Sequence, residues 1–437
     1  MSVRSCGSTT PRTRGFSRAT LALSFAAVAA FIPASTQAAY TQISRLFDGG
    51  TNGGNSNGLT YHSYRIPSIV RAGGTTLIAF AEGRRLSNSD WGETNLVYKR
   101  SLDNGVTWTQ LEVIEDVGLG VWGNPTAVWE PAWTGGPANG RVHLFFNGHS
   151  DAETSMSTIA PGDRKTYYTY SDNNGAPGSW APKQDLTATL KPSAMAWDAV
   201  GPGVGIFMAS NNMLIIPATE RNFYSTNHGT TWNYASLPAP NAANYPIEAR
   251  TGESTIVECL NGVIRRNDRV IGSVWDDGAA NYRRWCVDGI ISSGVPTFPT
   301  SPIRQDNLYC PSAEASILRY NLSQPDRIIF LNSDASGVSK TRCRMKVRIS
   351  YDDGLTWSRD RWLYVGTAAG QFATIEDAKA AGKGGYSSMA KSSDNHVVAL
   401  CESNDDPGDP NDDTDHLSID FHKFNLPWIL DGETDGP

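Results

Sequence analysis

The sequence has few cysteines, and their spacing matches no metal site. Six occur in 437 residues, with no CxxC pair and no zinc pattern. One of them, Cys6, lies in the N-terminal segment, and the odd number left behind predicts at least one thiol without an internal partner. Buried, unpaired cysteines are favoured slightly over one or two disulfides, whose connectivity the sequence does not give. The five are Cys259, Cys286, Cys310, Cys343 and Cys401.

Excess positive charge is also missing. The formal net charge is −7, and nucleic-acid binding requires a basic surface, so this class of partner is not expected. Helical periodicity is scarce, and beyond the N-terminal segment only Ala373–Gly382 looks helical. No apolar run is long enough to span a membrane.

The N-terminal segment differs from the rest of the chain. Four arginines precede an apolar run from Leu21 to Ile32, and Pro33 and several small residues follow it. This order is typical of a secretory signal peptide. The sequence therefore predicts a signal peptide over residues 1–39, one catalytic domain over residues 40–437, and secretion of the mature protein.

From residue 40 onward, short apolar runs alternate with turn residues. Runs such as TLIAFAEG, RVHLFFNG and RIIFLN are rich in branched and aromatic residues, and Gly, Asn, Asp and Pro separate them. Many short antiparallel strands give this pattern. We find no linker and no compositional break, so the pattern predicts a single all-β domain.

A short unit repeats along the chain. SLDNGVTW begins at Ser101 and SYDDGLTW at Ser350, whereas STNHGTTW at Ser225 has Asn227 in place of the acid. A degraded copy, SDNNGAPGSW, begins at Ser171. The Asp or Asn side chain can accept hydrogen bonds from its own turn, Gly supplies a positive φ, and Trp covers the turn. Each unit therefore predicts a hairpin between two strands.

These units resemble the Asp boxes of sialidase-type β-propellers. The resemblance implies an all-β fold, a six-bladed β-propeller of four-stranded antiparallel blades. Together with four further segments, the chain resembles the sialidase (exo-α-neuraminidase) family over most of residues 45–430. Two other stretches agree with the family, VGPGVGIFM from Val200 and the closing strand FHKFNLPWIL.

The first of the four segments is SYRIPSIV, which places Arg65 at the start of an apolar strand. A buried guanidinium is costly unless an anion meets it. The resemblance makes Arg65 the first of three arginines that hold the substrate's carboxylate, so we expect that anion to belong to the substrate. The alternative is a structural arginine paired with an acid of the protein.

The second segment is AEGRRLSNSDWGETNLVYKRS, which begins at Ala81. The resemblance places the acid/base aspartate at Asp90 and a further binding-site arginine at Arg84. Glu93 is the competing carboxylate, with a lesser expected role.

The third segment, TGESTIVECLNGVIRRNDR, predicts a hairpin around LNG. The resemblance assigns a catalytic glutamate to Glu253 and the second carboxylate-binding arginine to Arg269, in the N-x-R pattern that starts at Asn267. Glu258 precedes the turn and is expected to face elsewhere. The alternatives for these two roles are Glu258, Arg265 and Arg266.

The fourth segment, TRCRMKVRISYDDGLTW, leads into the last Asp box. The third arginine matches Arg342 best, and Arg344, expected on the same strand face, remains an alternative. Arg348 is expected to be structural. Downstream, GGYSSMA presents Tyr386 in the position of the family's nucleophile.

The resemblance implies a retaining exo-α-sialidase that releases terminal α-linked sialic acids from sialylated glycans through a covalent tyrosyl–sugar intermediate. Tyrosine nucleophiles are an exception among glycosidases, and a neutral phenol avoids repulsion by the substrate's carboxylate. Glu253 would accept the phenol proton, and Asp90 would protonate the leaving oxygen. The scheme requires no cofactor and no metal.

Several alternatives remain open. The same machinery can favour a deaminated nonulosonic acid (Kdn) or transfer the sugar to another glycan, and a non-catalytic sialic-acid-binding propeller is the hypothesis of a different class. The acidic stretch that begins at Glu402 and runs to His416 is expected to be a solvated surface loop rather than a calcium site. Trp122, Trp129 and Trp197 are candidates for either the sugar pocket or the core.

Overall fold

The computed structural model describes most of the chain beyond the N-terminal segment. The described residues are 39–50, 58–116, 120–149, 159–238, 250–271, 283–300, 302–311, 313–336, 342–404 and 416–436. They belong to one compact unit, Gln37–Pro437. Apart from Ala39, the predicted signal peptide lies outside the described residues and stays a prediction. Within the described ranges, no helix is long and apolar enough to cross a membrane.

The described strands pair into five sheets, and the largest contains nine strands. Its main path joins its first three strands to the next group through one parallel pair, Thr94 with Val121. Dividing the sheet at that pair gives two groups of strands. The first group is β2 (Ser63–Arg71), β3 (Leu77–Arg84), β4 (Thr94–Ser101) and β5 (Glu112–Glu115). The second is β6 (Val121–Glu130), β7 (Arg141–His149), β8 (Lys165–Ser171), β9 (Gln184–Asp185) and β10 (Gly203–Val204).

Two further sheets follow in chain order. One sheet contains β11 (Ile206–Met208), β12 (Met213–Ala218), β13 (Arg221–Ser225) and β14 (Asn233–Ser236). The next contains β15 (Arg250–Glu258), β16 (Ile264–Ile271), β17 (Arg283–Ser292), β18 (Val295–Thr297) and β19 (Ile303–Tyr309).

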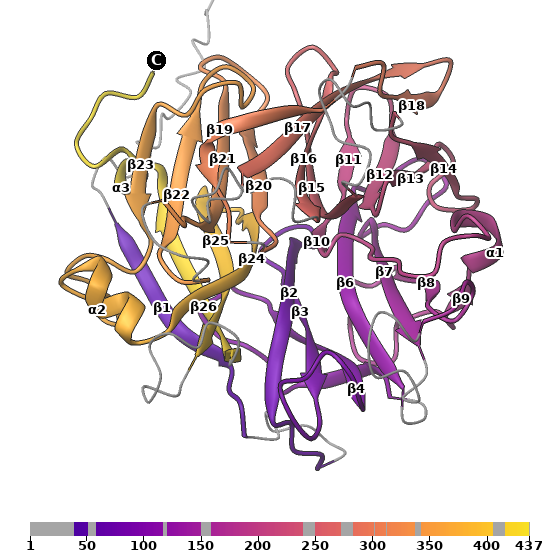
Figure 1. Cartoon of the computed structure of the whole chain (residues 1–437), viewed down its shortest axis with the longest axis horizontal. Coiled ribbons are helices and arrows are strands. Elements are labelled where there is room, and N and C mark those ends of the chain that lie inside the picture. The colour runs from indigo at the N-terminus through magenta and orange to yellow at the C-terminus, as the bar shows by residue number, and fades with distance from the viewer. Residues whose placement is uncertain are drawn as a thin grey trace, which may run out of the picture. The chain divides into compact units, whose positions relative to one another are not determined.

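The last two sheets complete the series. One contains β20 (Ser316–Asn321), β21 (Arg327–Ser333), β22 (Met345–Ser350) and β23 (Arg359–Trp362). The other contains β24 (Lys383–Lys391), β25 (His396–Asn404), β26 (His416–Asn425) and the first strand of the chain, β1 (Tyr40–Phe47). Figure 1 shows the groups of strands following one another around a common centre.

The all-β class predicted from the sequence is confirmed. The pairing differs from six separate four-stranded blades because β4 and β6 share one pair and because the β15–β19 sheet has five strands. The predicted helix at Ala373–Gly382 is present as α2 (Ile375–Ala380). Two short helices were not expected, α1 (Thr187–Leu190) and α3 (Leu426–Leu430), and α3 replaces the end of the predicted closing strand.

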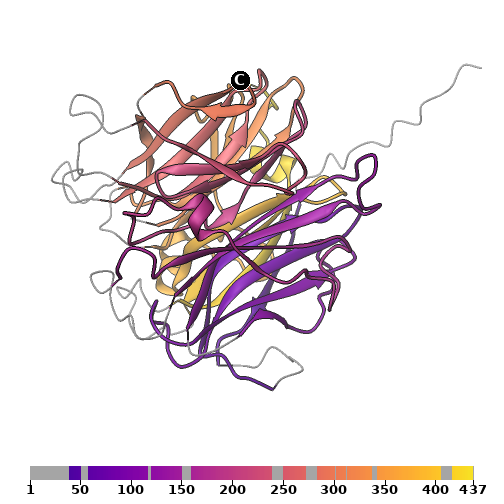
Figure 2. The same ribbon diagram turned by 90° about the vertical axis from the view of Figure 1, so that its right-hand side faces the viewer.

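The two ends of the unit are joined in one sheet. Strand β1 pairs antiparallel with β26, with Ile43 opposite His422 and Arg45 opposite Asp420. In Figure 1 the indigo β1 lies beside the yellow β26, and Figure 2 shows the same ribbon turned by 90°. The ring is therefore closed by backbone hydrogen bonds between its first and last strands.

The repeated units form the turns that their sequence predicts. In the first unit, the carboxylate of Asp103 accepts hydrogen bonds from the Thr107 N–H at 2.9 Å and from the Thr107 hydroxyl at 2.5 Å. The Ser101 hydroxyl accepts the Gly105 N–H at 2.7 Å. Gly105 has φ +88° and fits against Phe421 of the neighbouring sheet, whose ring also contacts Trp108.

The second clean copy and the near copy repeat this bonding. Asp352 accepts the Thr356 N–H at 2.9 Å, and Asn227 accepts the Thr231 N–H at the same distance. The amide of Asn227 therefore replaces the carboxylate without loss of the turn. All five cysteines of the described residues are buried, and Cys259, Cys286, Cys310 and Cys401 are free thiols, as the sequence favoured.

Candidate active site

One cavity collects every residue that the sequence nominated for chemistry. The seven nominated residues among its lining are Arg65, Arg84, Asp90, Glu253, Arg269, Arg342 and Tyr386. They come from five different segments of the ring, so convergence depends on the fold and not on proximity in the chain. The rest of the lining is Ile66, Glu82, Trp91, Val121, Asn124, Arg164, Trp197, Ala199 and Gly252.

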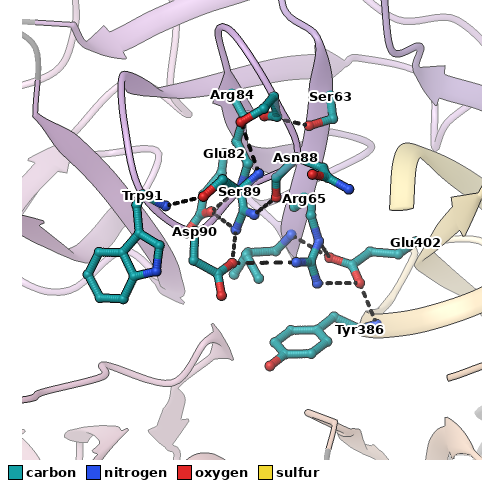
Figure 3. Close-up of polar contacts among 12 residues, drawn as sticks. Ser63, Arg65, Glu82, Arg84, Asn88, Ser89, Asp90, Trp91, Tyr386 and Glu402 are labelled. Carbon is teal, nitrogen blue, oxygen red and sulfur yellow. Dashed lines mark hydrogen bonds and ion pairs between the residues drawn. The ribbon is translucent and has the colours of Figure 1, made fainter. Parts of the chain in front are cut away.

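Arg65 lies in β2 and is only 5% exposed. Its Nε and Nη2 donate to the Oε1 and Oε2 of Glu402 at 3.1 and 3.2 Å. Its third guanidinium nitrogen, Nη1, lies 3.5 Å from Oδ1 of Asp90. The expectation that the substrate supplies the anion is thus incomplete, because a protein carboxylate already holds one edge of the guanidinium. Nη1 is the edge turned to the cavity (Figure 3).

Glu402 is a residue that the sequence analysis placed in a solvated loop. It is instead fully buried in β25, and it also accepts the backbone N–H groups of Ile66 and Tyr386, each at 2.9 Å. Burial alone would raise the pKa of Glu402, but Arg65, His416 and these two N–H groups lower it to about 2. A charged Glu402 therefore fixes Arg65 and the Tyr386 backbone relative to each other.

The backbone of Ile66 shows how tightly this region is held. Ile66 has φ +56°, a left-handed conformation that β-branched residues avoid. The pairing of β2 with β3 shifts register between Arg65 and Ser68, directly at this residue. In this strained conformation the Ile66 N–H points to Glu402 and donates a hydrogen bond to its carboxylate.

Asp90 stands on the loop after β3, and its side chain is 63% exposed. Its Oδ1 lies 2.8 Å from Nη2 of Arg84, and the same guanidinium donates to Glu82 at 2.7 Å (Figure 3). Burial of the carboxyl raises the pKa of Asp90, but Arg84 and Arg65 outweigh this and lower it below its ordinary value. Arg84 thus holds Asp90 at the mouth of the cavity in its charged form.

Tyr386 and Glu253 form the centre of the site. The Tyr386 hydroxyl donates to Oε1 of Glu253, and Arg269 binds Oε2 of the same carboxylate. Nη1 of Arg269 also lies 3.2 Å from the phenol oxygen. Burial raises the pKa of Tyr386, and Glu253 raises it further, whereas Arg269 and Arg342 oppose both. The phenol is therefore neutral at ordinary pH and is bonded to a proton acceptor.

The backbone presents Glu253 in an unusual way. The pairing of β15 with β16 shifts register between Gly252 and Ser254, and Glu253 has φ +53°. A side chain at such a bulge leaves the regular alternation of a strand. This turns Glu253 into the cavity at the start of the predicted hairpin.

The choice between Arg342 and Arg344 has a geometric answer. Arg342 lines the cavity, with its guanidinium 5.4 Å from the centre of the Tyr386 ring. Arg344 donates to the Ser336 carbonyl at 2.9 Å and lies 5.1 Å from the Trp362 ring. The expectation of a shared strand face is wrong, because β22 begins only at Met345 and Arg344 has φ +63°.

The competing acids and arginines are engaged in the framework of the fold. Glu93 binds Arg85 at 3.2 Å, and Glu258 accepts the Ser210 hydroxyl at 2.7 Å. Arg265 pairs with Asp288, and Arg266 pairs with Asp268, both acids of the β15–β19 sheet. Arg348 of β22 pairs with Asp334. None of these five residues lines the cavity that holds Tyr386.

The tryptophans separate into pocket and core. Trp197 lines the cavity and stacks on Arg164 at 4.1 Å, and Trp91 lies beside it with ring centres 6.3 Å apart. Trp122 packs on Phe146 instead, 6.1 Å between ring centres. Sequence reasoning missed Trp91 and Arg164, although Trp91 directly follows the nominated Asp90.

No metal centre emerges from the described residues, where no group of three or more potential ligands gathers. Residues 405–415 of the acidic stretch lie outside the described residues, so the prediction of a surface loop stays untested there. Its two flanks, Glu402 and His416, are buried in strands, which corrects the prediction at both ends.

Comparison with known proteins supports the same architecture. A family model described as a BNR repeat-like domain matches residues 75–398. An exo-alpha-sialidase of Aspergillus fumigatus is 35% identical over 407 residues, covering 86% of this chain and 87% of that protein. An exo-alpha-sialidase of Arthroderma benhamiae is 33% identical over 404 residues and covers 86% of each.

A solved structure extends the agreement to the fold. The Trypanosoma rangeli sialidase superimposes with a TM-score of 0.64 at 17% identity, covering 90% of this chain and 61% of that one. At this identity the likeness concerns the fold alone. The predicted β-propeller class is confirmed.

Proposed function

The chain belongs to the exo-α-sialidase family of glycoside hydrolases, and from this premise we propose that it removes terminal α-linked sialic acids with retention, through a covalent bond to Tyr386. The observation that carries the proposal is the convergence of three guanidinium groups on one phenol. Arg65 and Arg342 lie 5.5 and 5.4 Å from its ring centre, and Arg269 lies 3.2 Å from its oxygen.

The three arginines would bind the carboxylate on the sugar's anomeric carbon. Guanidinium groups form bidentate, charge-assisted hydrogen bonds with carboxylates, which lysine cannot reproduce. Arg65 is held by Glu402 and Arg269 by Glu253, so both are oriented before the substrate arrives. Binding there would place the anomeric carbon close to the Tyr386 hydroxyl.

In the first half-reaction, the phenol oxygen forms a bond to the anomeric carbon as the glycosidic C–O bond breaks. The phenol proton moves to Glu253, with which it already shares a hydrogen bond. Asp90 delivers a proton to the departing oxygen. A neutral nucleophile suits this step, because an anionic one would be repelled by the substrate's own carboxylate.

In the second half-reaction, water attacks the same carbon and Asp90 accepts its proton. The bond to Tyr386 breaks, and the phenol oxygen recovers its proton from Glu253. Two displacements at one carbon give net retention. Asp90 regains from water the proton that it gave to the leaving group, so all three side chains end in their starting protonation states and water is the one co-reactant.

The proposal is tested with a fluorogenic α-sialoside and two variants. We expect Tyr386→Phe and Glu253→Gln to lose at least about a thousandfold in kcat, since each removes a group that acts only in the transition state. NMR of the first-formed anomer should show the α-product. After incubation with a 3-fluorosialosyl fluoride, mass spectrometry should detect one sugar covalently attached to Tyr386. Hydrolysis by Tyr386→Phe at the wild-type rate contradicts the proposal.

The same assay separates the three related functions that the sequence left open. The ratio of kcat/KM for N-acetylated and deaminated substrates decides between sialic acid and Kdn. Product analysis with lactose as acceptor distinguishes hydrolysis from transfer. Binding of a sialoside without turnover would favour a non-catalytic propeller. Secretion, expected from residues 1–39, is tested by N-terminal sequencing of protein from the culture medium.

A further inference from the structure

Strand β24 is irregular where it carries Tyr386. Its pairing with β25 shifts register between Lys383 and Ser387, so the three residues between them stand outside the regular ladder. Gly384 and Gly385 have φ +150° and +140°, which few side chains tolerate. A catalytic side chain placed on such a segment requires support from outside the ladder.

Two buried carboxyl groups supply that support. The Tyr386 N–H donates to Oε2 of Glu402 at 2.9 Å, and the Ser387 N–H donates to Oε2 of Glu314 at 2.8 Å. These N–H groups belong to consecutive residues. The two carboxyl groups therefore hold the backbone directly before and directly after the Cα atom that carries the phenol. Glu402 belongs to β25 of the same sheet, whereas Glu314 lies before β20 of the neighbouring sheet.

Glu314 differs from Glu402 in its charge environment. It is 2% exposed, and among the residues that the structure describes it forms no ion pair. The nearby guanidinium of Arg284 is directed to the Ala313 carbonyl and to Asn267. Burial raises the pKa of Glu314 well above its ordinary value; the Ser387 N–H and Arg284 lower it in part, and Glu253 and Glu402 add to the rise. A neutral carboxyl can accept the Ser387 N–H without adding charge beneath the Tyr386–Glu253 pair.

The same segment also packs against the phenol. Ala313, the neighbour of Glu314, forms a buried cluster with Ile66 and Tyr386. The segment therefore contacts both the ring and the backbone of the nucleophile strand.

We propose that Glu314 is a positioning residue for the reaction: by holding the Ser387 N–H it fixes the Tyr386 phenol relative to Glu253. This inference rests on the proposed function, since it assumes that Tyr386 attacks the sugar. It requires the acceptor oxygen of Glu314 and not its charge.

The test compares Glu314→Gln, Glu314→Ala and Glu314→Asp on the same fluorogenic sialoside. Gln retains the acceptor at the same reach, so kcat should stay within about threefold of wild type, with an unchanged pH profile. Ala removes the acceptor and Asp shortens its reach, so kcat should fall between about tenfold and a hundredfold, with KM within about threefold. Because Asp leaves no large void, it keeps the test valid if Ala fails to fold.

Glu258→Ala is the matched control. Glu258 is another buried glutamate that accepts a hydrogen bond, and it stands at the C-terminal end of β15, five residues after Glu253. It should lower the melting temperature while leaving kcat unchanged. Equal kcat losses in the Glu258 and Glu314 variants would reduce Glu314 to a general stability residue and overturn the proposal.

Two further outcomes would also overturn it. One is a wild-type kcat in both Glu314→Ala and Glu314→Asp, and the other is a kcat of Glu314→Gln as low as that of Glu314→Ala. The Tyr386→Phe variant separates this inference from the proposed function. If Tyr386→Phe abolishes turnover but the Glu314 variants behave as wild type, only the positioning role is wrong. If the Tyr386→Phe variant retains full turnover, the proposed function itself is wrong.

Discussion

Glu402 and Arg65 are 337 positions apart in the chain, yet two parallel hydrogen bonds of 3.1 and 3.2 Å join them at the centre of the ring. Both side chains are buried, and only one guanidinium edge faces the cavity. A buried ion pair of this kind contributes little net stability but makes the loss of either partner costly. Its clearest effect is orientation of Arg65 before a ligand binds.

Replacing Glu402 with Gln should destabilise the protein by about 3–5 kcal/mol at neutral pH, because Arg65 then keeps a buried charge without its partner. We expect a lower urea midpoint and a strong rise in KM. Wild-type KM in a folded Glu402→Gln protein would contradict the orienting role. Glu115→Gln, at a buried glutamate that is paired with Lys183 and does not line the cavity, is the matched control and should leave KM unchanged.

The same carboxyl predicts how stability depends on pH. Its pKa of about 2 in the folded protein lies below the value of an unfolded chain. A lowered folded-state pKa adds stability that is fully present above about pH 4.3 and is lost as the pH falls toward 2. The difference corresponds to about 3 kcal/mol. Between pH 5 and pH 2, the free energy of unfolding should therefore fall less steeply with decreasing pH in Glu402→Gln than in wild type. Equal slopes in the two proteins would contradict this.

Asp90 gives a kinetic prediction. It must be protonated to act as an acid, but Arg84 and Arg65 lower its pKa in the free enzyme. A bound carboxylate would offset these cations, so the alkaline limb of kcat should lie at higher pH than that of kcat/KM. Replacing Arg84 with Gln removes one lowering charge and should move the kcat/KM limb to higher pH. An unmoved limb in this variant would argue against Asp90 as the acid.

Arg342 and Arg344 form a matched pair for mutation. Removing Arg342 takes away one charged partner of the substrate's carboxylate, a loss of at least about 2 kcal/mol. This corresponds to a drop of at least about thirtyfold in kcat/KM for Arg342→Ala. Arg344→Ala should lower the melting temperature slightly and keep kcat/KM near wild type, because its contacts are with Ser336 and Trp362. The reverse pattern would reassign the third arginine.

The Asp-box glycine gives a stability prediction. Gly105→Ala adds a methyl group both at a positive φ and against the Phe421 ring, so it should cost about 2–4 kcal/mol. Gly178→Ala is the control, since Gly178 has φ +72° but open space around it. It should cost only about 1 kcal/mol. Equal losses, measured by urea denaturation, would show that packing against Phe421 contributes nothing.

Much of the fold was predictable because its signals are local. Each Asp box encodes its own turn through the Ser, Asp or Asn, Gly and Trp at fixed spacing, and the hydrogen bonds of Asp103 and Asp352 repeat one another closely. The seven nominated residues could be identified for the same reason, since each lies in a local motif, and the fold then brings them into one cavity.

What the sequence did not predict depends on distant partners or on the backbone. Glu402 was assigned to an acidic loop because its neighbours in the chain are polar, whereas its environment is set by Arg65 across the ring. Arg344 was placed on the face of Arg342 by strand alternation, which its positive φ removes. Trp91 lies in the segment that contains Asp90 but was not nominated, and Arg164 belongs to no quoted segment; the folded chain brings both to the cavity.

The pairing of β1 with β26 also constrains how the polypeptide can be assembled as it emerges from the ribosome. Tyr40–Phe47 is made before the other described strands, whereas its partner His416–Asn425 is made after them. The last sheet, which contributes Tyr386 and Glu402, therefore stays incomplete until His416–Asn425 has been synthesised. A nascent chain that ends before β26 lacks the complete sheet on which these two residues of the cavity stand.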